Sequence, residues 1–181
     1  PERLLPLTAL VGVSVCAAVE RVCGTRPGLK WPNDPVLNGK KLCGILTELS
    51  MEGESGRVAY VVTGIGINVG QTPDDFSPEV AEMATSLSWE LKRAVSRPRL
   101  AAAVIEELDR AYDALCRGDL SEYLYACRRD CVNVGKRVQL ISDAGREEAD
   151  AVGLDDAFGL IVRDASGAER VIRAGEVSVR G

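Results

Sequence analysis

The spacing of apolar residues predicts an N-terminal helix over residues 5–22. Pro6 suits its first turn, and Gly24 suits its end. The segment is apolar on nearly every side, so we expect it to be buried against something large, for which a sheet is the natural candidate. The extended runs and turns that follow predict an antiparallel meander with this helix on one face. Its segments are 29–34, Asn38–Gly39, 41–51, 53–56 and 57–69.

Helical spacing returns after a loop at 70–78 that contains proline and aspartate. Ser96 is placed to cap a long helix over 98–117, and Gly118 is placed to end it. Shorter helices are expected over about 79–84 and about 120–129.

The helical period stops after Val134, where short alternating runs separated by glycine-containing turns begin. About 48 residues with four or five short strands predict a small closed barrel. We therefore expect an α+β protein. A mixed or antiparallel sheet packed with helices (1–132) should be followed by a small β-barrel (133–181), with a boundary near 132–134.

The composition narrows the function mainly by exclusion. Acidic residues number 27 and basic residues 22, and the net charge of −5 argues against a general nucleic-acid or anionic-membrane binder. Residues 1–70 carry a net charge of +1, so an anionic ligand is expected in that part. We expect no apolar stretch long enough to span a bilayer and see no signal peptide. The chain has no histidine, so its chemistry must use lysine, arginine, carboxylates, backbone dipoles or a bound metal.

The six cysteines form no C-x-x-C pair, and several lie in apolar runs. Small buried thiols in a reducing cytosol explain them better than disulfides or a zinc site. The cysteines are Cys16, Cys23, Cys43, Cys116, Cys127 and Cys131.

Chemistry-bearing residues are densest in Lys30-Trp31-Pro32-Asn33-Asp34 and in the run from Lys40 to Leu46. A lysine pair opens a strand there, beside an Asn-Asp turn. Lys41 begins an apolar run, so its side chain points either to solvent or into a pocket. An ordinary solvated hairpin with surface lysines is the alternative interpretation.

A second cluster, Gly64-Ile65-Gly66-Ile67-Asn68, places two glycines inside a strand. Each weakens the strand by roughly 0.5–1 kcal/mol relative to alanine. Such glycines are tolerated where a ligand or another backbone approaches closely, or at a bulge or sheet crossing. The cluster is not a dinucleotide fingerprint, because it lacks the third glycine and no helix follows it.

Taken together, the motifs KWPND, GKKLCGIL and GIGIN resemble the catalytic domain of biotin protein ligases in order and spacing. The end of the chain, GEVSVR, is similar to the small Src-homology-3-like barrel that closes these enzymes. The resemblance implies a catalytic domain like that of class II aminoacyl-tRNA synthetases. It also implies a ligase that activates biotin with ATP to biotinyl-5′-adenylate and transfers it to a carrier-protein lysine.

The resemblance also assigns roles to individual residues. Lys41 is implied as the catalytic lysine, bridging the biotin carboxylate and the α-phosphate, a task that suits a compact ammonium charge. Asp34 is implied to position the carrier lysine or a metal, and Trp31 is expected to be a packing residue beside the site. The implied biotin contacts are Lys41, Gly44, Leu46 and Gly64, and the implied nucleotide contacts are Asn33, Asn68 and Arg180.

The implied small molecules are biotin, ATP and Mg²⁺, with no dedicated protein metal ligand. The implied partner is a biotin carboxyl carrier protein, with no nucleic acid and no membrane, in a cytoplasmic enzyme that can be a homodimer. The family's catalytic domain also has an earlier portion, with a Gly/Arg-rich loop over biotin, which has no counterpart in this chain. We therefore expect the chain to be a fragment, or to lack residues before Pro1, and not to be fully active alone.

Three alternatives stay open. A lipoate or octanoate ligase shares the fold and differs in its ligand. A non-enzymatic biotin-binding module would account for the missing loop. The C-terminal barrel could also serve as a nucleic-acid or peptide adaptor, which its net charge of −2 over 134–181 disfavours.

Overall fold

The computed structural model describes residues 4–53, 57–142, 145–173 and 175–179. The helices are α1 (Leu4–Cys23), α2 (Pro78–Met83), α3 (Leu87–Leu91), α4 (Arg97–Arg117) and α5 (Ser121–Asp130), with a short 3-10 turn η2 (Pro73–Asp75). The N-terminal strands are β1 (Gly28–Lys30), β2 (Asp34–Leu37), β3 (Lys40–Lys41), β4 (Cys43–Glu52) and β5 (Arg57–Ile67). The C-terminal strands are β6 (Arg137–Ser142), β7 (Gly145–Leu154), β8 (Leu160–Arg163), β9 (Glu169–Ile172) and β10 (Glu176–Val179).

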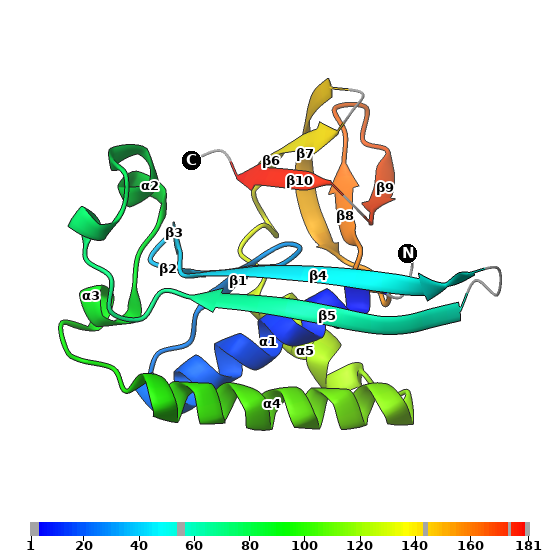
Figure 1. Cartoon of the computed structure of the whole chain (residues 1–181). Coiled ribbons are helices and arrows are strands. Elements are labelled where there is room, and N and C mark those ends of the chain that lie inside the picture. Colours follow the sequence, from blue (N-terminus) through cyan, green and yellow to red (C-terminus); the bar gives the residue numbers. More distant parts are fainter. Residues whose placement is uncertain (1–3, 54–56, 143–144, 174, 180–181) are drawn as a thin grey trace.

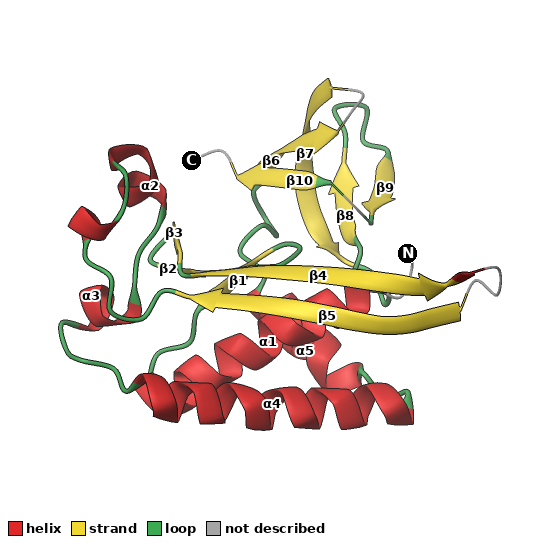
Figure 2. Ribbon diagram, viewed as in Figure 1, coloured by secondary structure: helices red, strands yellow, loops and turns green. Residues whose placement is uncertain are grey.

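A long β4–β5 ribbon crosses the middle of the molecule (Figure 1). Helices α1, α4 and α5 lie on one side of it, and strands β6–β10 stand on the other (Figure 2). Strands β1, β2 and β3 pair antiparallel in that order, and β6–β10 form an antiparallel sheet in the order β10-β6-β7-β8-β9. We call the latter the C-terminal sheet.

Helix α1 confirms the first prediction, but its main partner is not a sheet. Most of its contacts are with α4, and fewer are with β4 and α5. The reason is that α4 offers an apolar stripe at helical spacing, which includes Leu100, Ala103, Val104 and Ala111, all buried. Polar bonds add to this packing, because Arg21 Nη2 donates to Ala103 O at 3.1 Å.

The expectation about membrane-spanning length was wrong for this helix. By length and composition alone, Pro6–Cys23 could cross a membrane, with a mean hydropathy of 1.5. However, 61 % of that segment is buried inside the protein, as in a helix of a protein core. Its apolar character is therefore explained by packing.

The long run predicted as one strand over 41–51 is divided at Leu42. The Leu42 amide donates to Pro35 O, and the Lys41 carbonyl accepts from Thr85 N at 2.9 Å. The chain thus changes partners between β3 and β4, which sequence spacing does not reveal. Helix α3 was missed as well, although Ser86 Oγ caps it by accepting from Trp89 N at 3.2 Å. The caps predicted for α4 at Ser96 and Gly118 are confirmed.

Buried side chains of the C-terminal sheet and of the N-terminal part belong to one continuous hydrophobic cluster. Leu10, Leu29 and Trp31 contribute from the N-terminal part, and Val138 and Phe158 contribute from the C-terminal part. A second cluster lies among α1, α4 and β4. The C-terminal sheet is therefore packed against the segment that carries the KWPND motif.

Asp130 at the end of α5 is the centre of a largely buried ion-pair network. Its side chain is 8 % exposed, and its carboxylate lies 2.7 Å from Arg26 and 2.8 Å from Arg129. Burial alone would raise its pKa, but the hydrogen bonds from Arg129 and Arg26 outweigh this and hold the pKa of Asp130 below its ordinary value of 3.8.

We expect Asp130→Asn to lower the free energy of unfolding by about 3 kcal/mol at neutral pH, because it leaves the Arg26 charge without its buried partner. A lowered native pKa means that the stabilisation is present at neutral pH and is lost as the pH falls through the native value. The wild-type and variant urea midpoints should therefore converge as the pH falls through and below the lowered native pKa of Asp130. Asp156→Asn is the control, since Asp156 is 93 % exposed in its pair with Arg128 and should leave the midpoint unchanged.

Candidate functional site

A cavity of about 760 Å³ is lined both by the β4–β5 ribbon and by the C-terminal sheet. This volume lies in the range of small-molecule sites. The lining residues come from the KWPND turn, from β3 to β5 and from the C-terminal sheet. They are Lys30, Trp31, Pro32, Asn33, Asp34, Lys41, Gly44, Ile45, Leu46, Gly64, Ile65, Gly66, Gly175 and Val177.

The floor of the cavity is a stretch of strand with almost no side chains. Gly44 pairs with Gly66, and Leu46 pairs with Gly64, so all four lie on one face of the ribbon. A Cβ added at Gly64 would meet only Leu46 O, at 3.9 Å, and one at Gly66 would meet only Gly44 O, at 3.9 Å. The fold itself therefore does not require glycine here, and the open strand backbone can lie against a flat ligand.

Lys41 enters the cavity from a backbone that is held on both sides. It pairs with Val36 of β2, and its carbonyl accepts from Thr85 on the other side. Its Nζ lies 2.6 Å from Asp34 Oδ1, and its side chain is 48 % exposed. An ammonium has three N–H donors, so the ion pair leaves Lys41 able to bind an anionic ligand as well.

The turn between β1 and β2 is tied to the floor through Asn33. Its Nδ2 donates to Ile45 O at 2.7 Å, which joins the turn to β4. Trp31 is 2 % exposed, in line with its predicted role as a packing residue. Lys30 pairs with Asp34 in the strand register, so both side chains leave the hairpin on one face.

The cavity brings together most of the predicted site residues: Asn33, Asp34, Lys41, Gly44, Leu46 and Gly64. Asn68 is not among the lining residues. It follows β5, where its backbone amide donates to Leu42 O at 2.9 Å and its backbone carbonyl accepts from Leu87 N at 3.1 Å. Arg180 lies outside the described residues.

Sequence reasoning missed several lining residues. Lys30 and Gly66 belong to the motifs that were singled out, and the two-residue period of a strand places Gly66 on the same face as Gly64. That signal could have found Gly66. Gly175 and Val177 belong to the GEVSVR segment, of which only Arg180 was assigned to the site, and tertiary packing brings them to the cavity.

The charged groups in the cavity favour charge stabilisation over nucleophilic chemistry at a thiol. Burial raises the pKa of the neighbouring Cys43 thiol to about 12, so it stays protonated at neutral pH and is a poor nucleophile. The described residues contain no cluster of three or more potential metal ligands of the Cys, Asp or Glu type. Among the described lining residues, Asp34 supplies the carboxylate, and Lys30 and Lys41 supply the cations.

A second cavity, of about 590 Å³, lies among α1, α4 and α5. Much of its charge is neutralised internally. Arg26 is paired with Asp130 at 2.7 Å, and Arg110 with Glu107 at 2.5 Å. It lacks a bare strand floor and an exposed lysine of the Lys41 kind, so the first cavity is the candidate site.

No family model matches the sequence. Among curated proteins, the chain is similar to the bifunctional ligase/repressor BirA of Bacillus subtilis, with 32 % identity over 96 % of this chain and 53 % of that protein. It is also similar to the biotin–[acetyl-CoA-carboxylase] ligase of Paracoccus denitrificans, with 32 % identity over 97 % of this chain and 73 % of that protein. The chain spans about half the length of the Bacillus relative.

The fold is similar to that of the biotin protein ligase of Aquifex aeolicus. Its apo structure gives a TM-score of 0.85 at 28 % identity, over 99 % of this chain and 76 % of that one. Its complex with biotin and ATP gives a TM-score of 0.83 at 28 % identity, over 98 % of this chain and 72 % of that one. Sequence and structure thus agree that the chain belongs to the biotin–[acetyl-CoA-carboxylase] ligase family and has the biotin protein ligase fold, a mixed α/β fold with antiparallel sheets.

Proposed function

We propose that this protein is a biotin protein ligase, which activates biotin with ATP and transfers the biotinyl group to a lysine of a biotin carboxyl carrier protein. The observation that carries the proposal is the cavity that unites the Lys41–Asp34 pair with a glycine floor. The similarity of the whole chain to the Aquifex protein solved with biotin and ATP supports the choice of ligands.

In the first step, a biotin carboxylate oxygen attacks the α-phosphorus of ATP. A phosphorus–oxygen bond forms to give biotinyl-5′-adenylate, and pyrophosphate leaves. Two anionic groups must approach each other, so a fixed cation at their meeting point lowers the barrier. Lys41 is suited to this role because its backbone is held by β2 and Thr85 while its ammonium lies at the open cavity.

In the second step, the neutral amine of the carrier lysine attacks the carbonyl carbon of the mixed anhydride. An amide forms, AMP leaves with the bonding electrons, and the amine loses a proton. Asp34 is the carboxylate placed to orient the incoming amine, because it lies in the same cavity, 2.6 Å from Lys41.

The remaining roles divide between the two ends of the ligand. Gly44, Leu46 and Gly64 form the surface for biotin, since the floor there is open. Asn33 is proposed to contact the nucleotide, and its amide is already fixed by Ile45. Asn68 and Arg180 are proposed for the same side on the strength of the sequence resemblance alone.

A magnesium ion fits this site only as an ion carried by the nucleotide. Mg²⁺ in such sites commonly takes one or two carboxylates together with substrate phosphates and water. Asp34 is the carboxylate among the described lining residues, so it would be the protein ligand. The ion would neutralise phosphate charge, while Lys41 and Asp34 retain the roles given above.

We further propose that 1–132 forms a catalytic domain like that of class II aminoacyl-tRNA synthetases and that 133–181 forms an Src-homology-3-like barrel. The change of sequence texture after Val134 and the antiparallel order of the C-terminal sheet support this division. We also propose a cytoplasmic enzyme, capable of forming a homodimer, that binds neither nucleic acid nor a membrane through this part.

Ligand-dependent thermal stabilisation tests the choice of substrate against a lipoate or octanoate ligase. For the protein expressed from its complete reading frame, biotin at about 100 times its Kd should stabilise by about 2.7 kcal/mol, a shift of several degrees. Lipoate and octanoate at the same concentration should leave the melting temperature unchanged. A shift with lipoate but not with biotin would favour the related ligase instead.

A further inference from the structure

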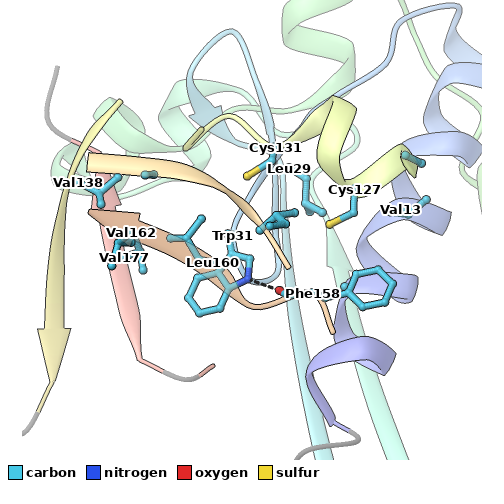
Figure 3. Close-up of a cluster of buried hydrophobic side chains, with 14 of the residues drawn as sticks. Val13, Leu29, Trp31, Cys127, Cys131, Val138, Phe158, Leu160, Val162 and Val177 are labelled. Atoms are coloured by element: carbon cyan, nitrogen blue, oxygen red, sulfur yellow. Dashed lines mark hydrogen bonds between the residues drawn. The ribbon is translucent and has the colours of Figure 1, made fainter. Parts of the chain in front are cut away.

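Trp31 joins the candidate site to the C-terminal sheet by two buried hydrogen bonds. Its indole Nε1 donates to the Phe158 carbonyl at 2.9 Å, and its backbone amide donates to Asn133 Oδ1 at 2.7 Å. The indole bond is visible in Figure 3, where Trp31 lies between the C-terminal strands and the chain around Cys131. Trp31 also lines the cavity, so these bonds act on a wall of the site.

Asn133, which accepts the hydrogen bond from the Trp31 backbone amide, is itself held firmly in place. It is fully buried, with 0 % exposure. The segment just before it lies beside β1, since Val132 N donates to Leu29 O at 3.0 Å and Leu29 forms an isolated parallel bridge with Cys131. The backbone carbonyl of Asn133 accepts from Lys136 N at 3.1 Å, so the chain is held on both sides of this residue.

Phe158, which accepts the hydrogen bond from the Trp31 indole, lies in a tight turn between β7 and β8. Its φ is +64°, a conformation that side chains other than glycine adopt only when the surroundings enforce it. Asp155 provides that enforcement by accepting from Ala157 N at 2.9 Å and from Gly159 N at 2.7 Å. Phe158 is 1 % exposed, so the turn is fixed by packing as well.

The residues directly after Trp31 carry the polar side chains of the site. Asn33 reaches Ile45 at 2.7 Å, and Asp34 reaches Lys41 at 2.6 Å. A shift of the Trp31 backbone would move both of them, and a displacement of about 1 Å in a catalytic group can cost about 100-fold in rate. By contrast, the glycine floor is held by the β4–β5 pairing, which does not depend on Trp31.

We propose that Asn133 and the turn 155–158 form a clamp that positions the Trp31–Asp34 turn for the chemical step. The C-terminal sheet thereby takes part in the reaction through Trp31. The effect of the clamp on the reaction rests on the proposed ligase function, while its effect on the order of the turn does not. Asn133 and Trp31 are assigned as positioning residues, which act through Asn33 and Asp34.

The test uses Trp31→Phe, which removes the indole N–H, and Asn133→Ala, which removes the acceptor for the Trp31 amide. Val162→Ala is the matched control. Val162 lies in β8 and is only 1 % exposed, and its apolar side chain cannot form a hydrogen bond to the Trp31–Asp34 turn. All three are compared in the full protein at a temperature where each is folded. Hydrogen–deuterium exchange of the peptide covering 30–37 and the kinetics of biotin-dependent pyrophosphate exchange are measured.

Both clamp variants should raise amide exchange over 30–37 and should lower kcat by about tenfold or more, with KM for biotin nearly unchanged. Val162→Ala should lower the melting temperature without either effect. Unchanged amide exchange in both clamp variants would overturn the clamp, as would an equal loss of kcat in Val162→Ala. If the wild-type protein shows no pyrophosphate exchange, the ligase function fails, and the amide exchange alone then decides whether the clamp orders the turn.

Discussion

Replacing Lys41 with alanine is expected to lower the rate of biotin adenylation by about 100- to 1000-fold, or about 3–4 kcal/mol of transition-state stabilisation. The reason is local, since Lys41 lines the cavity and supplies its ammonium from a backbone fixed on both sides. The half-exposed Lys41–Asp34 pair adds little to folding, so the melting temperature should change by only a few degrees. Pyrophosphate exchange measures the rate.

Lys40→Ala is the matched control for this variant. Lys40 is the neighbouring residue in β3, but its Nζ donates to Ala81 O at 3.0 Å, and it does not line the cavity. Its removal should leave adenylation within about twofold of wild type. Lys41→Arg should restore only part of the rate, because a planar guanidinium does not reproduce a compact ammonium. A Lys41→Ala protein with the wild-type adenylation rate would remove Lys41 from the mechanism.

Replacing Gly64 with valine is expected to weaken biotin binding on the order of 100-fold while leaving the protein as stable as before, or more so. A Cβ at this position meets only Leu46 O, at 3.9 Å, so the fold has room for it. Valine also favours a strand over glycine by about 0.5–1 kcal/mol. The added methyl groups would instead occupy the space above the floor where the ligand is proposed to lie. Isothermal titration with biotin and thermal unfolding measure the two effects.

Gly153→Val is the matched control for the floor variant. Gly153 also lies in a strand, β7, and a Cβ there would meet only Ile161 Cδ1, at 3.9 Å. It is not among the residues that line the cavity, so biotin affinity should be unchanged. Wild-type biotin affinity in the Gly64→Val protein would place the ligand elsewhere.

Sequence reasoning could find those site residues that a motif or the strand period marks, and it missed those that only the folded structure brings to the cavity. The family resemblance pointed to Lys41, Asn33 and Asp34 and to the biotin contacts Gly44, Leu46 and Gly64, all of which line the cavity. Gly66 was not chosen, although the two-residue period of the strand places it on the same face as Gly64. Its pairing with Gly44 across the ribbon is a tertiary property that the sequence does not show.

The fold shows the same division between local and tertiary information. Caps and apolar spacing identified α1 and α4, whose ends depend on nearby residues such as Ser96 and Gly118. Spacing could not show that α1 packs mainly on a helix, because any apolar stripe satisfies the same requirement. Nor could it show that Trp31 bonds to Phe158, a contact between residues 127 positions apart.

The most direct test of the account is biotin-dependent exchange of labelled pyrophosphate into ATP, with the protein expressed from its complete reading frame. We expect exchange that requires biotin, is lost in Lys41→Ala and is retained in Lys40→Ala. Exchange that is absent although biotin still binds would contradict it and would identify the cavity as a binding site without ligase chemistry.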